Sequence, residues 1–284
     1  MNANPRTTDS RKIDLICLDV DGTLIGQEPV IHERVWKAAR SAQAAGIHLA
    51  ICTGRPGIGP TEGYAEALDP DGWHIFQGGA SLYHLKSKAE KSHPLQEQKI
   101  DELCALQKKE GWVLEWYSNG DFTCDAKEGH GFQLAVDHAR LIGLKHTLRK
   151  RESLKGEPVR AQWVVTTAQL DKVLSTAPEG LNYASATSPS VPGVHFVSVT
   201  TQGVNKCTAI ETLATEILGS SLAKTMMVGD GQNDLSALEM VGYPVAMENA
   251  DPLLAKVAKY RAGHVEVGGA ADAILLAIEI NQSA

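Results

Sequence analysis

An apolar run that ends in two carboxylates is the feature that most constrains this fold. Residues 13–18 (IDLICL) are typical of a largely buried strand of a parallel sheet, and Asp19 and Asp21 follow them, with Gly22 next. Carboxylates at the end of a buried strand cost free energy unless other groups compensate for their charge. The pattern therefore predicts that the loop after this strand has a functional role.

Strand and helix patterns alternate on both sides of the chain's middle. This holds along the first 80 residues and again after Gly203. Such an order favours a parallel sheet with helices on its faces, an α/β fold. Strands are expected at residues 13–18, 47–52, 74–77, 225–228 and 244–247, and helices at 31–45, 61–68, 206–218, 234–241 and 270–280.

The middle of the chain has another pattern, in which short strands with aromatic residues lie between helical segments. We therefore expect residues 1–80 and 200–284 to form the α/β core and residues 81–199 to form an inserted α+β domain. Strands are expected there at 113–117, 162–166 and 195–199, and helices at 100–110, 131–141 and 168–177.

Composition argues against several classes of protein. A formal net charge of -7 over 284 residues gives no basic field that would attract a nucleic acid. No run approaches the roughly 18 apolar residues of a membrane-spanning helix, and the polar N-terminus lacks a secretory signal. The five scattered cysteines form no CxxC pair, which is typical of a reducing cytoplasm. We expect a cytoplasmic protein with no nucleic-acid or membrane partner.

Polar side chains recur where other predicted strands end. Thr53 follows the second strand, Asp230, Asn233 and Asp234 follow the strand at 225–228, and Lys206 begins the helix before that strand. Loops that leave the carboxyl ends of parallel strands converge on one crevice. We therefore expect these side chains to meet the carboxylates of the first loop.

Each cluster also has a purely structural interpretation. The D-x-D-G pattern resembles the opening of a calcium loop, but the twelfth residue from Asp19 is Val30, where that loop needs a glutamate. Thr53 could lie in a simple turn, Lys206 could be a solvated surface residue, and Asn233 or Asp234 could only cap a helix.

A phosphate and a metal ion together would explain all the clusters. Carboxylates gathered in one crevice repel one another and need a cation, and hard oxygen ligands favour Mg²⁺. Beside such an ion Asp19 stays ionised and can attack phosphorus. Lys206 and Thr53 would then stabilise the charge on the transferring oxygens.

Four motifs carry a resemblance to a known family. They are DVDGT at 19–23, TGR at 53–55, GVNK at 203–206 and GDGQND at 229–234. In this order and spacing they closely resemble the haloacid dehalogenase (HAD) superfamily of phosphatases. The insert is similar to the type IIB cap of Cof-like sugar phosphatases, sucrose-phosphate phosphatase and phosphomannomutase. The resemblance implies a Rossmann-like core, a mobile cap that sets substrate specificity, and dependence on Mg²⁺.

The resemblance also implies a role for each motif residue. Asp19 would be the nucleophile and a metal ligand, and Asp21 the general acid and base, with its backbone carbonyl a second metal ligand. Asp230 would be the third ligand of Mg²⁺, with Asp234 supporting it. Thr53, Gly54, Lys206 and Asn233 would bind the phosphate.

The expected activity follows from Asp21, since protonating a leaving oxygen and then activating water is what hydrolysis requires. We expect an Mg²⁺-dependent phosphomonoester hydrolase that acts on a small phosphorylated metabolite, a sugar phosphate above all, through an aspartyl-phosphate. The alternatives are a phosphomutase and a non-catalytic phosphometabolite-binding protein. The sequence departs from the Cof-like pattern at Gly78, where those proteins usually carry asparagine.

Overall fold

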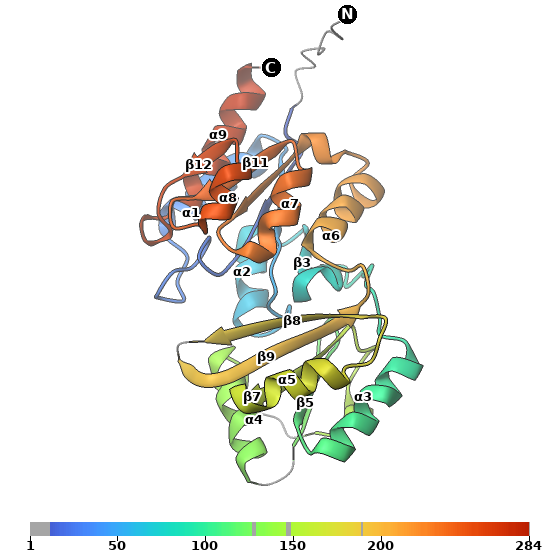
Figure 1. Cartoon of the computed structure of the whole chain (residues 1–284). Helices are drawn as coiled ribbons and strands as arrows, with labels where there is room; N and C mark the ends of the chain where they lie inside the picture. Colours follow the sequence, from blue (N-terminus) through green and yellow to red (C-terminus); the bar gives the residue numbers. More distant parts are fainter. Residues whose placement is uncertain (1–11, 127–128, 146–148, 189, 284) are drawn as a thin grey trace, which may run out of the picture. The chain divides into compact units, whose positions relative to one another are not determined.

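The chain folds into two compact units. The computed structural model describes residues 12–126, 129–145, 149–188 and 190–283 (Figure 1). Unit 1 consists of Met1–Ile51 and Ile210–Ala284, and unit 2 is the continuous stretch Cys52–Ala209. The first and last parts of the chain therefore build one unit, and the middle of the chain builds the other.

Unit 1 contains a parallel five-stranded sheet with the strand order β12-β11-β10-β1-β2. The first strand, β1, lies next to β2 on one side. On its other side lies β10, followed by β11 and β12. The strands are β1 (Leu15–Leu18), β2 (His48–Ile51), β10 (Thr225–Gly229), β11 (Tyr243–Met247) and β12 (Tyr260–Ala262). The α/β fold with a parallel-sheet core is confirmed.

Helices cover both faces of this sheet. Parallel connections are right-handed, so strands added in opposite directions place their helices on opposite faces. The connection from β1 to β2 carries α1, whereas those from β10 to β12 carry α7 and α8 on the other face; α9 packs against α1. The helices of unit 1 are α1 (Glu33–Ala44), α7 (Leu235–Met240), α8 (Pro252–Val257) and α9 (Ala270–Ser283), and α6 (Lys206–Thr212) crosses the boundary between the two units at Ala209 and Ile210.

The sequence of α1 shows why it forms there. His32 caps the helix, since its Nδ1 accepts a hydrogen bond from the Arg34 N–H at 3.2 Å. Beyond the helix, Gly46 has a φ of 77°, which glycine adopts at little cost, and the chain turns into β2. The buried side of the helix carries small residues at helical spacing: Val35, Ala38, Ala39 and Ala42.

Unit 2 contains a two-stranded hairpin and an antiparallel sheet of order β6-β5-β7-β9-β8. The hairpin consists of β3 (Trp73–Phe76) and β4 (Ser81–His84), and the sheet of β5 (Val113–Tyr117), β6 (Phe122–Asp125), β7 (Arg160–Thr166), β8 (Leu181–Ser188) and β9 (Val191–Thr201). The helices are α2 (Pro60–Leu68), α3 (Glu97–Glu110), α4 (His130–Leu141) and α5 (Thr167–Thr176).

Each face of the antiparallel sheet packs on helices. Trp116 and Trp163 lie on one face, in a cluster with side chains of α3 and α5. Val113 and Val164 lie on the other face, in a cluster with Leu134 of α4. Successive strand residues therefore point into two different cores, as the pleat requires.

Two sequence expectations were wrong or incomplete. The strand at 74–77 does not extend the parallel sheet: β3 pairs with β4, and a single parallel bridge links Ile75 to Cys52. After Ile51 the chain turns at Thr53 and Gly54, so β2 ends too early to pair with β3 along its length. In contrast, β4 pairs with β3 at four residues. The elements β4, β6, β8, α8 and β12 were also missed. In β8 the reason is clear, because this edge strand is partly exposed and has a polar sequence.

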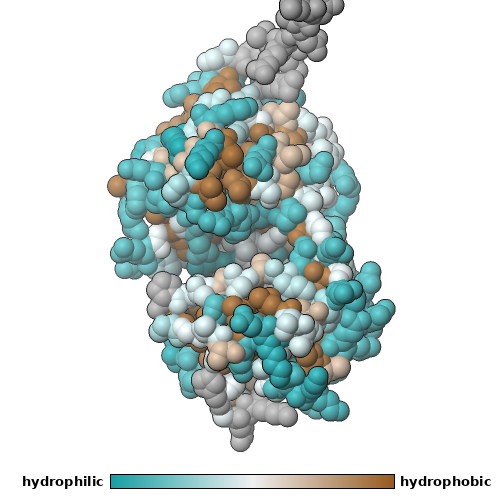
Figure 2. Space-filling model, in the orientation of Figure 1, coloured by the Kyte–Doolittle hydropathy of each residue, from teal (hydrophilic) through white to brown (hydrophobic). Residues whose placement is uncertain are grey.

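Hydrophilic side chains dominate the face drawn in Figure 2, and hydrophobic ones form small islands on it. Within the described ranges, no helix is both long enough and apolar enough to span a bilayer.

Candidate active site

The loop after β1 is a tight turn that presents Asp19. The Asp19 N–H donates to the carbonyl of Val228 in β10 at 3.0 Å, so this residue still follows the sheet. The Val20 carbonyl then accepts from the N–H groups of Leu24 and Ile25, both at 2.9 Å, and closes the loop. Asp19 is only 5% exposed. The sheet and the loop together therefore fix the start of the DVDGT motif.

Gly22 lets this loop approach the end of β10. Its φ is +80°, and a Cβ built on it would lie 2.0 Å from Oδ2 of Asp230. Any side chain here would therefore displace Asp230. Thr23 lies beside the same carboxylate, and its hydroxyl donates to Asp230 Oδ1 at 3.3 Å. The glycine of the motif is thus required by a close contact between two loops.

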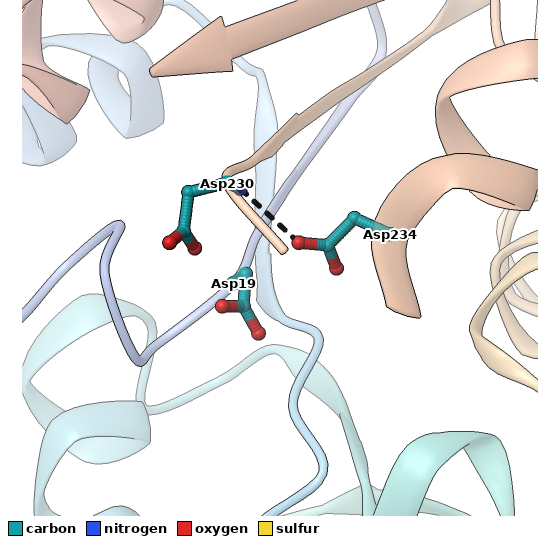
Figure 3. Close-up of side chains that lie close together, drawn as sticks. All are labelled: Asp19, Asp230 and Asp234. Carbon is teal, nitrogen blue, oxygen red and sulfur yellow. Dashed lines mark hydrogen bonds between the residues drawn. The ribbon is translucent and has the colours of Figure 1, made fainter. Parts of the chain in front are cut away.

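The loop after β10 folds around Asp234. Its Oδ2 accepts from the backbone N–H groups of Asp230 and Gly231, both at 3.2 Å. A Cβ on Gly229 would lie 2.4 Å from the same oxygen, so the strand must end in glycine. Figure 3 shows Asp234 approaching the Asp230 backbone from its helix. Asp234 therefore shapes the loop that carries Asp230.

Three of the predicted residues meet in unit 1. Asp19, Asp230 and Asp234 each offer a carboxylate oxygen, and these oxygens lie within 4.8 Å of one another (Figure 3). The donor set is all oxygen and of one charge sign, which suits a hard divalent cation such as Mg²⁺ better than a soft metal. Burial raises the pKa of the Cys17 thiol, so this neighbour stays a protonated, inert residue.

Two further residues lie on the same two loops. Asp21 is exposed, two residues after Asp19, and forms a bridge with Ile25. Asn233 is also exposed, in the 3-10 turn Gln232–Asp234 that precedes α7. Their exposure leaves both side chains accessible from solvent.

The predicted phosphate residues Thr53 and Gly54 lie in unit 2 and are held by backbone contacts. The Thr53 N–H donates to Ile75, and the Thr53 carbonyl accepts from Gly78 N–H, both at 2.9 Å. The Thr53 hydroxyl oxygen accepts from the Arg55 N–H at 3.1 Å. Gly54 is exposed, and its N–H forms no hydrogen bond with the part of the chain that the structure describes.

Lys206 begins α6 and is only 3% exposed. Asn205 caps this helix: its Oδ1 accepts from the Thr208 N–H at 3.0 Å, and Thr208 Oγ1 accepts from the Asn205 N–H at 3.1 Å. A Cβ on Gly79 would lie 2.2 Å from the Asn205 carbonyl. Residues 77–79 thus contact both the Thr53 segment and the start of α6. Gly78, with a φ of 68°, lies between those contacts.

The comparison with protein families gives a match along most of the chain. Residues 16–274 match the family model described as haloacid dehalogenase-like hydrolase. The chain is a haloacid dehalogenase-like hydrolase. This family generally uses a divalent metal, in keeping with the three converging carboxylates.

Curated relatives of this hydrolase are named as phosphatases. One from Streptococcus pyogenes serotype M6, named "Putative phosphatase", is 28% identical over 272 residues, which cover 92% of this chain and 97% of the relative. The Bacillus subtilis 5-amino-6-(5-phospho-D-ribitylamino)uracil phosphatase YcsE is 25% identical over 258 residues, which cover 87% of this chain and 89% of YcsE. The hydrolase is therefore a phosphatase of the HAD superfamily, as its motifs predicted.

Solved structures of similar proteins confirm the fold. A haloacid dehalogenase-like hydrolase from Bacteroides thetaiotaomicron has a TM-score of 0.79 at 23% identity, covering 93% of this chain and 99% of that one. The HAD subclass IIB sugar phosphatase BT4131 has a TM-score of 0.73 at 20% identity, covering 94% of this chain and 99% of that one.

The sequence analysis of this hydrolase missed Asn249, just after β11. Its Nδ2 donates to the Gly22 carbonyl at 2.7 Å, and its Oδ1 accepts from the Val265 N–H at 3.1 Å. It therefore ties the DVDGT loop to a later part of unit 1. The signal that revealed the other loops, a polar residue after a buried strand, was present here too.

Proposed function

We propose that this phosphatase is an Mg²⁺-dependent phosphomonoester hydrolase of a small phosphorylated metabolite. The observation that carries the proposal is the convergence of Asp19, Asp230 and Asp234 at the ends of two neighbouring parallel strands. Like charges concentrated in this way favour a bound cation, and the family chemistry is phosphate ester hydrolysis.

The residues suited to hold Mg²⁺ are those of the two loops. We assign Asp19, Asp230 and the backbone carbonyl of Asp21 as its protein ligands, with Asp234 fixing the Asp230 loop through its two backbone hydrogen bonds. When bound, the ion would neutralise the carboxylates and reduce the repulsion between Asp19 and an approaching phosphate.

Asp19 and Asp21 then divide the chemistry. A carboxylate oxygen of Asp19 attacks phosphorus, and the bond from phosphorus to the ester oxygen breaks, which leaves an aspartyl-phosphate. Asp21 gives a proton to the departing oxygen and afterwards takes one from the water that cleaves the aspartyl-phosphate. The exposure of Asp21 supports this role, since it must meet both the leaving group and water.

Phosphate binding is assigned to four residues that each carry a hydrogen-bond donor. The Thr53 hydroxyl, the Gly54 N–H, the Lys206 ammonium and the Asn233 amide would bind the phosphoryl oxygens. Support comes from the Gly54 N–H, which has no acceptor in the described chain, and from Lys206, buried at the start of a helix.

A sugar phosphate in the cytoplasm is the substrate we propose. Residues 81–199 would act as the type IIB cap that contacts the leaving group. Two names support this choice: BT4131 is called a sugar phosphatase, and YcsE a phosphatase of a phosphoribityl compound. The cytoplasmic location is supported by five cysteines that are all free thiols.

A panel of phosphorylated metabolites, assayed for released phosphate with Mg²⁺, tests the proposal. Asp19→Asn should abolish release, whereas Asp101→Asn, which neutralises an exposed carboxylate on α3, should leave it unchanged. Chelation of Mg²⁺ should stop the wild type. Isomerised sugar phosphate with little free phosphate would instead favour a phosphomutase, and tight binding without turnover a binding protein. Activity that survives Asp19→Asn would contradict the assigned nucleophile.

A further inference from the structure

Arg160 is a buried arginine whose hydrogen bond goes to the TGR motif. Its Nη1 donates to the Gly54 carbonyl at 2.7 Å, and the residue is only 5% exposed. Its Cζ lies 4.1 Å from the centre of the Tyr117 ring. No carboxylate of the described residues lies within ion-pair distance of this guanidinium. Burying an arginine without a direct ion pair is costly, so packing alone does not account for it.

A buried polar network fixes Tyr117 beside this guanidinium. The Tyr117 hydroxyl and the Gln162 amide donate to Oε2 of Glu115 at 2.8 and 3.0 Å, and His138 Nδ1 lies 2.9 Å from the same carboxylate. The Gln162 amide nitrogen also lies 3.1 Å from His138 Nε2. The amide nitrogen of Gln162 can only donate, so His138 Nε2 accepts. The proton of the His138 ring is therefore on Nδ1 and points to Glu115.

The network therefore supplies a negative charge near Arg160 without a direct ion pair. The carboxyl group of Glu115 receives three hydrogen bonds, which hold it in place beside Tyr117. Burial lowers the pKa of the Arg160 guanidinium, while Tyr117 and Glu115 raise it. Arg160 remains charged, because an arginine guanidinium is not deprotonated in proteins.

The hydrogen bond from Arg160 controls more than one atom of the motif. The Gly54 carbonyl belongs to the same planar peptide unit as the Arg55 N–H. That N–H donates to the Thr53 hydroxyl oxygen at 3.1 Å. A hydroxyl that accepts one hydrogen bond still has its proton to donate, in a direction that the accepted bond restricts. Arg160 is thus connected to the Thr53 hydroxyl through one rigid peptide.

We propose that Arg160 is a positioning residue for phosphate binding, which fixes the Gly54–Arg55 peptide so that the Thr53 hydroxyl donates to the phosphate. The inference rests on the proposed function, in which Thr53 binds that group. The neighbouring Gly54 N–H depends less on Arg160, because its peptide is held by the bond from Gly78 to the Thr53 carbonyl. The effect of Arg160 should therefore pass through Thr53.

A double-mutant cycle on inorganic phosphate, used as a competitive inhibitor of p-nitrophenyl phosphate hydrolysis with Mg²⁺, tests this route. Thr53→Val and Arg160→Met should each raise the inhibition constant about tenfold. The double variant should stay near the single ones, since the second change removes nothing more. Arg160→Lys should return the constant to within about threefold of wild type, because an ammonium can also donate to a carbonyl.

Arg149→Met is the matched control. Arg149 donates to Asp121 at 2.5 Å and to the Phe122 carbonyl at 2.9 Å, elsewhere in unit 2. Its replacement should lower the melting temperature and leave the inhibition constant unchanged.

Two results would overturn the proposal: a wild-type inhibition constant in Arg160→Met, or effects of the two changes that multiply to about a hundredfold. Should Arg160→Met not fold, Arg160→Gln, which is too short to reach the carbonyl, takes its place in the cycle. A wild type that releases no phosphate would contradict the proposed function. If the wild type is active but the changes at Arg160 leave the inhibition constant of phosphate unaltered, only the positioning role would be contradicted.

Discussion

Two polar clusters in this molecule balance charge in opposite ways. In unit 1, Asp19, Asp230 and Asp234 bring carboxylate oxygens of one charge sign within 4.8 Å of one another. In unit 2, Glu115 receives three hydrogen bonds and lies near the positive Arg160. The proposed cation would balance the like charges of the first cluster, whereas the second cluster already has the positive Arg160 beside it. Neutralising one carboxylate in each should therefore have opposite consequences.

The largest effect is expected in unit 1. Asp19→Asn should lower phosphate release by about 10,000-fold or more, because the proposed nucleophile is lost. The free energy of unfolding without Mg²⁺ should stay the same or rise, because one of three like charges disappears. Activity and urea unfolding measured on the same preparation check both parts. A loss of stability that parallels the loss of activity would break the comparison.

In unit 2 the same chemical change should destabilise the protein. Glu115→Gln leaves the Arg160 charge buried without its negative neighbour and weakens three hydrogen bonds, which should cost about 3 kcal/mol. Urea unfolding gives the value. Glu102→Gln is the control, since Glu102 pairs with Lys99 on the surface of α3 and its loss should hardly change stability. An unaltered Glu115→Gln protein would show that the network does not need its charge.

The buried polar network in unit 2 could not be predicted from the sequence. Glu115 and Tyr117 alternate with apolar residues in β5, as Arg160 and Gln162 do in β7. Alternating polar residues predict a face exposed to solvent. Here α4 covers that face and contributes His138 to it. Tertiary packing, which a single sequence does not reveal, decided the environment of these residues.

The cluster in unit 1 was easier to predict, because one rule applies to all its members. Asp19 and Asp230 both follow apolar runs, and parallel strands end on the same edge of a sheet. The pattern did not reveal that β10 pairs directly with β1, which brings the two loops into contact. It also missed the Gly22 contact with Asp230, since a glycine in a loop has many possible reasons.

His74, which lies outside the network, should contribute to the pH dependence of stability. It is buried outside the network, donates from Nε2 to the Asp69 carbonyl at 2.8 Å, and has a pKa lowered to about 4 by burial. The unfolded chain takes up the proton first as pH falls below about 6.5. Stability should therefore be full above pH 6.5 and fall by about 3 kcal/mol as pH approaches 4.

His74→Gln, which keeps a donor, should remove this part of the acid slope in unfolding experiments. The remaining slope would then report the other titrating groups of the protein. An unchanged slope would show that His74 is not the group that titrates.

Mg²⁺ should stabilise the wild type but not a protein with an altered carboxylate cluster. An ion at about 100 times its dissociation constant adds about 2.7 kcal/mol when it binds only the folded state. Asp230→Asn should lose this gain, whereas Glu115→Gln, although less stable, should keep it. Thermal melting with and without Mg²⁺ measures the difference. If Glu115→Gln, rather than Asp230→Asn, lost the stabilisation by Mg²⁺, the assignment of the metal site to unit 1 would be contradicted.

The smallest effect is expected from a single methyl group on Gly54. A Cβ there meets no atom of the described chain within 4 Å, so Gly54→Ala should leave stability unchanged. If its N–H binds phosphate, the methyl group should hinder the substrate and raise KM by about tenfold. Gly22→Ala is the contrasting change in unit 1, since its Cβ would lie 2.0 Å from Asp230 Oδ2 at a φ of +80°. That variant should lose both activity and stability, because there the obstacle is the protein itself. A Gly54→Ala enzyme with the wild-type KM would remove Gly54 from the proposed phosphate ligands.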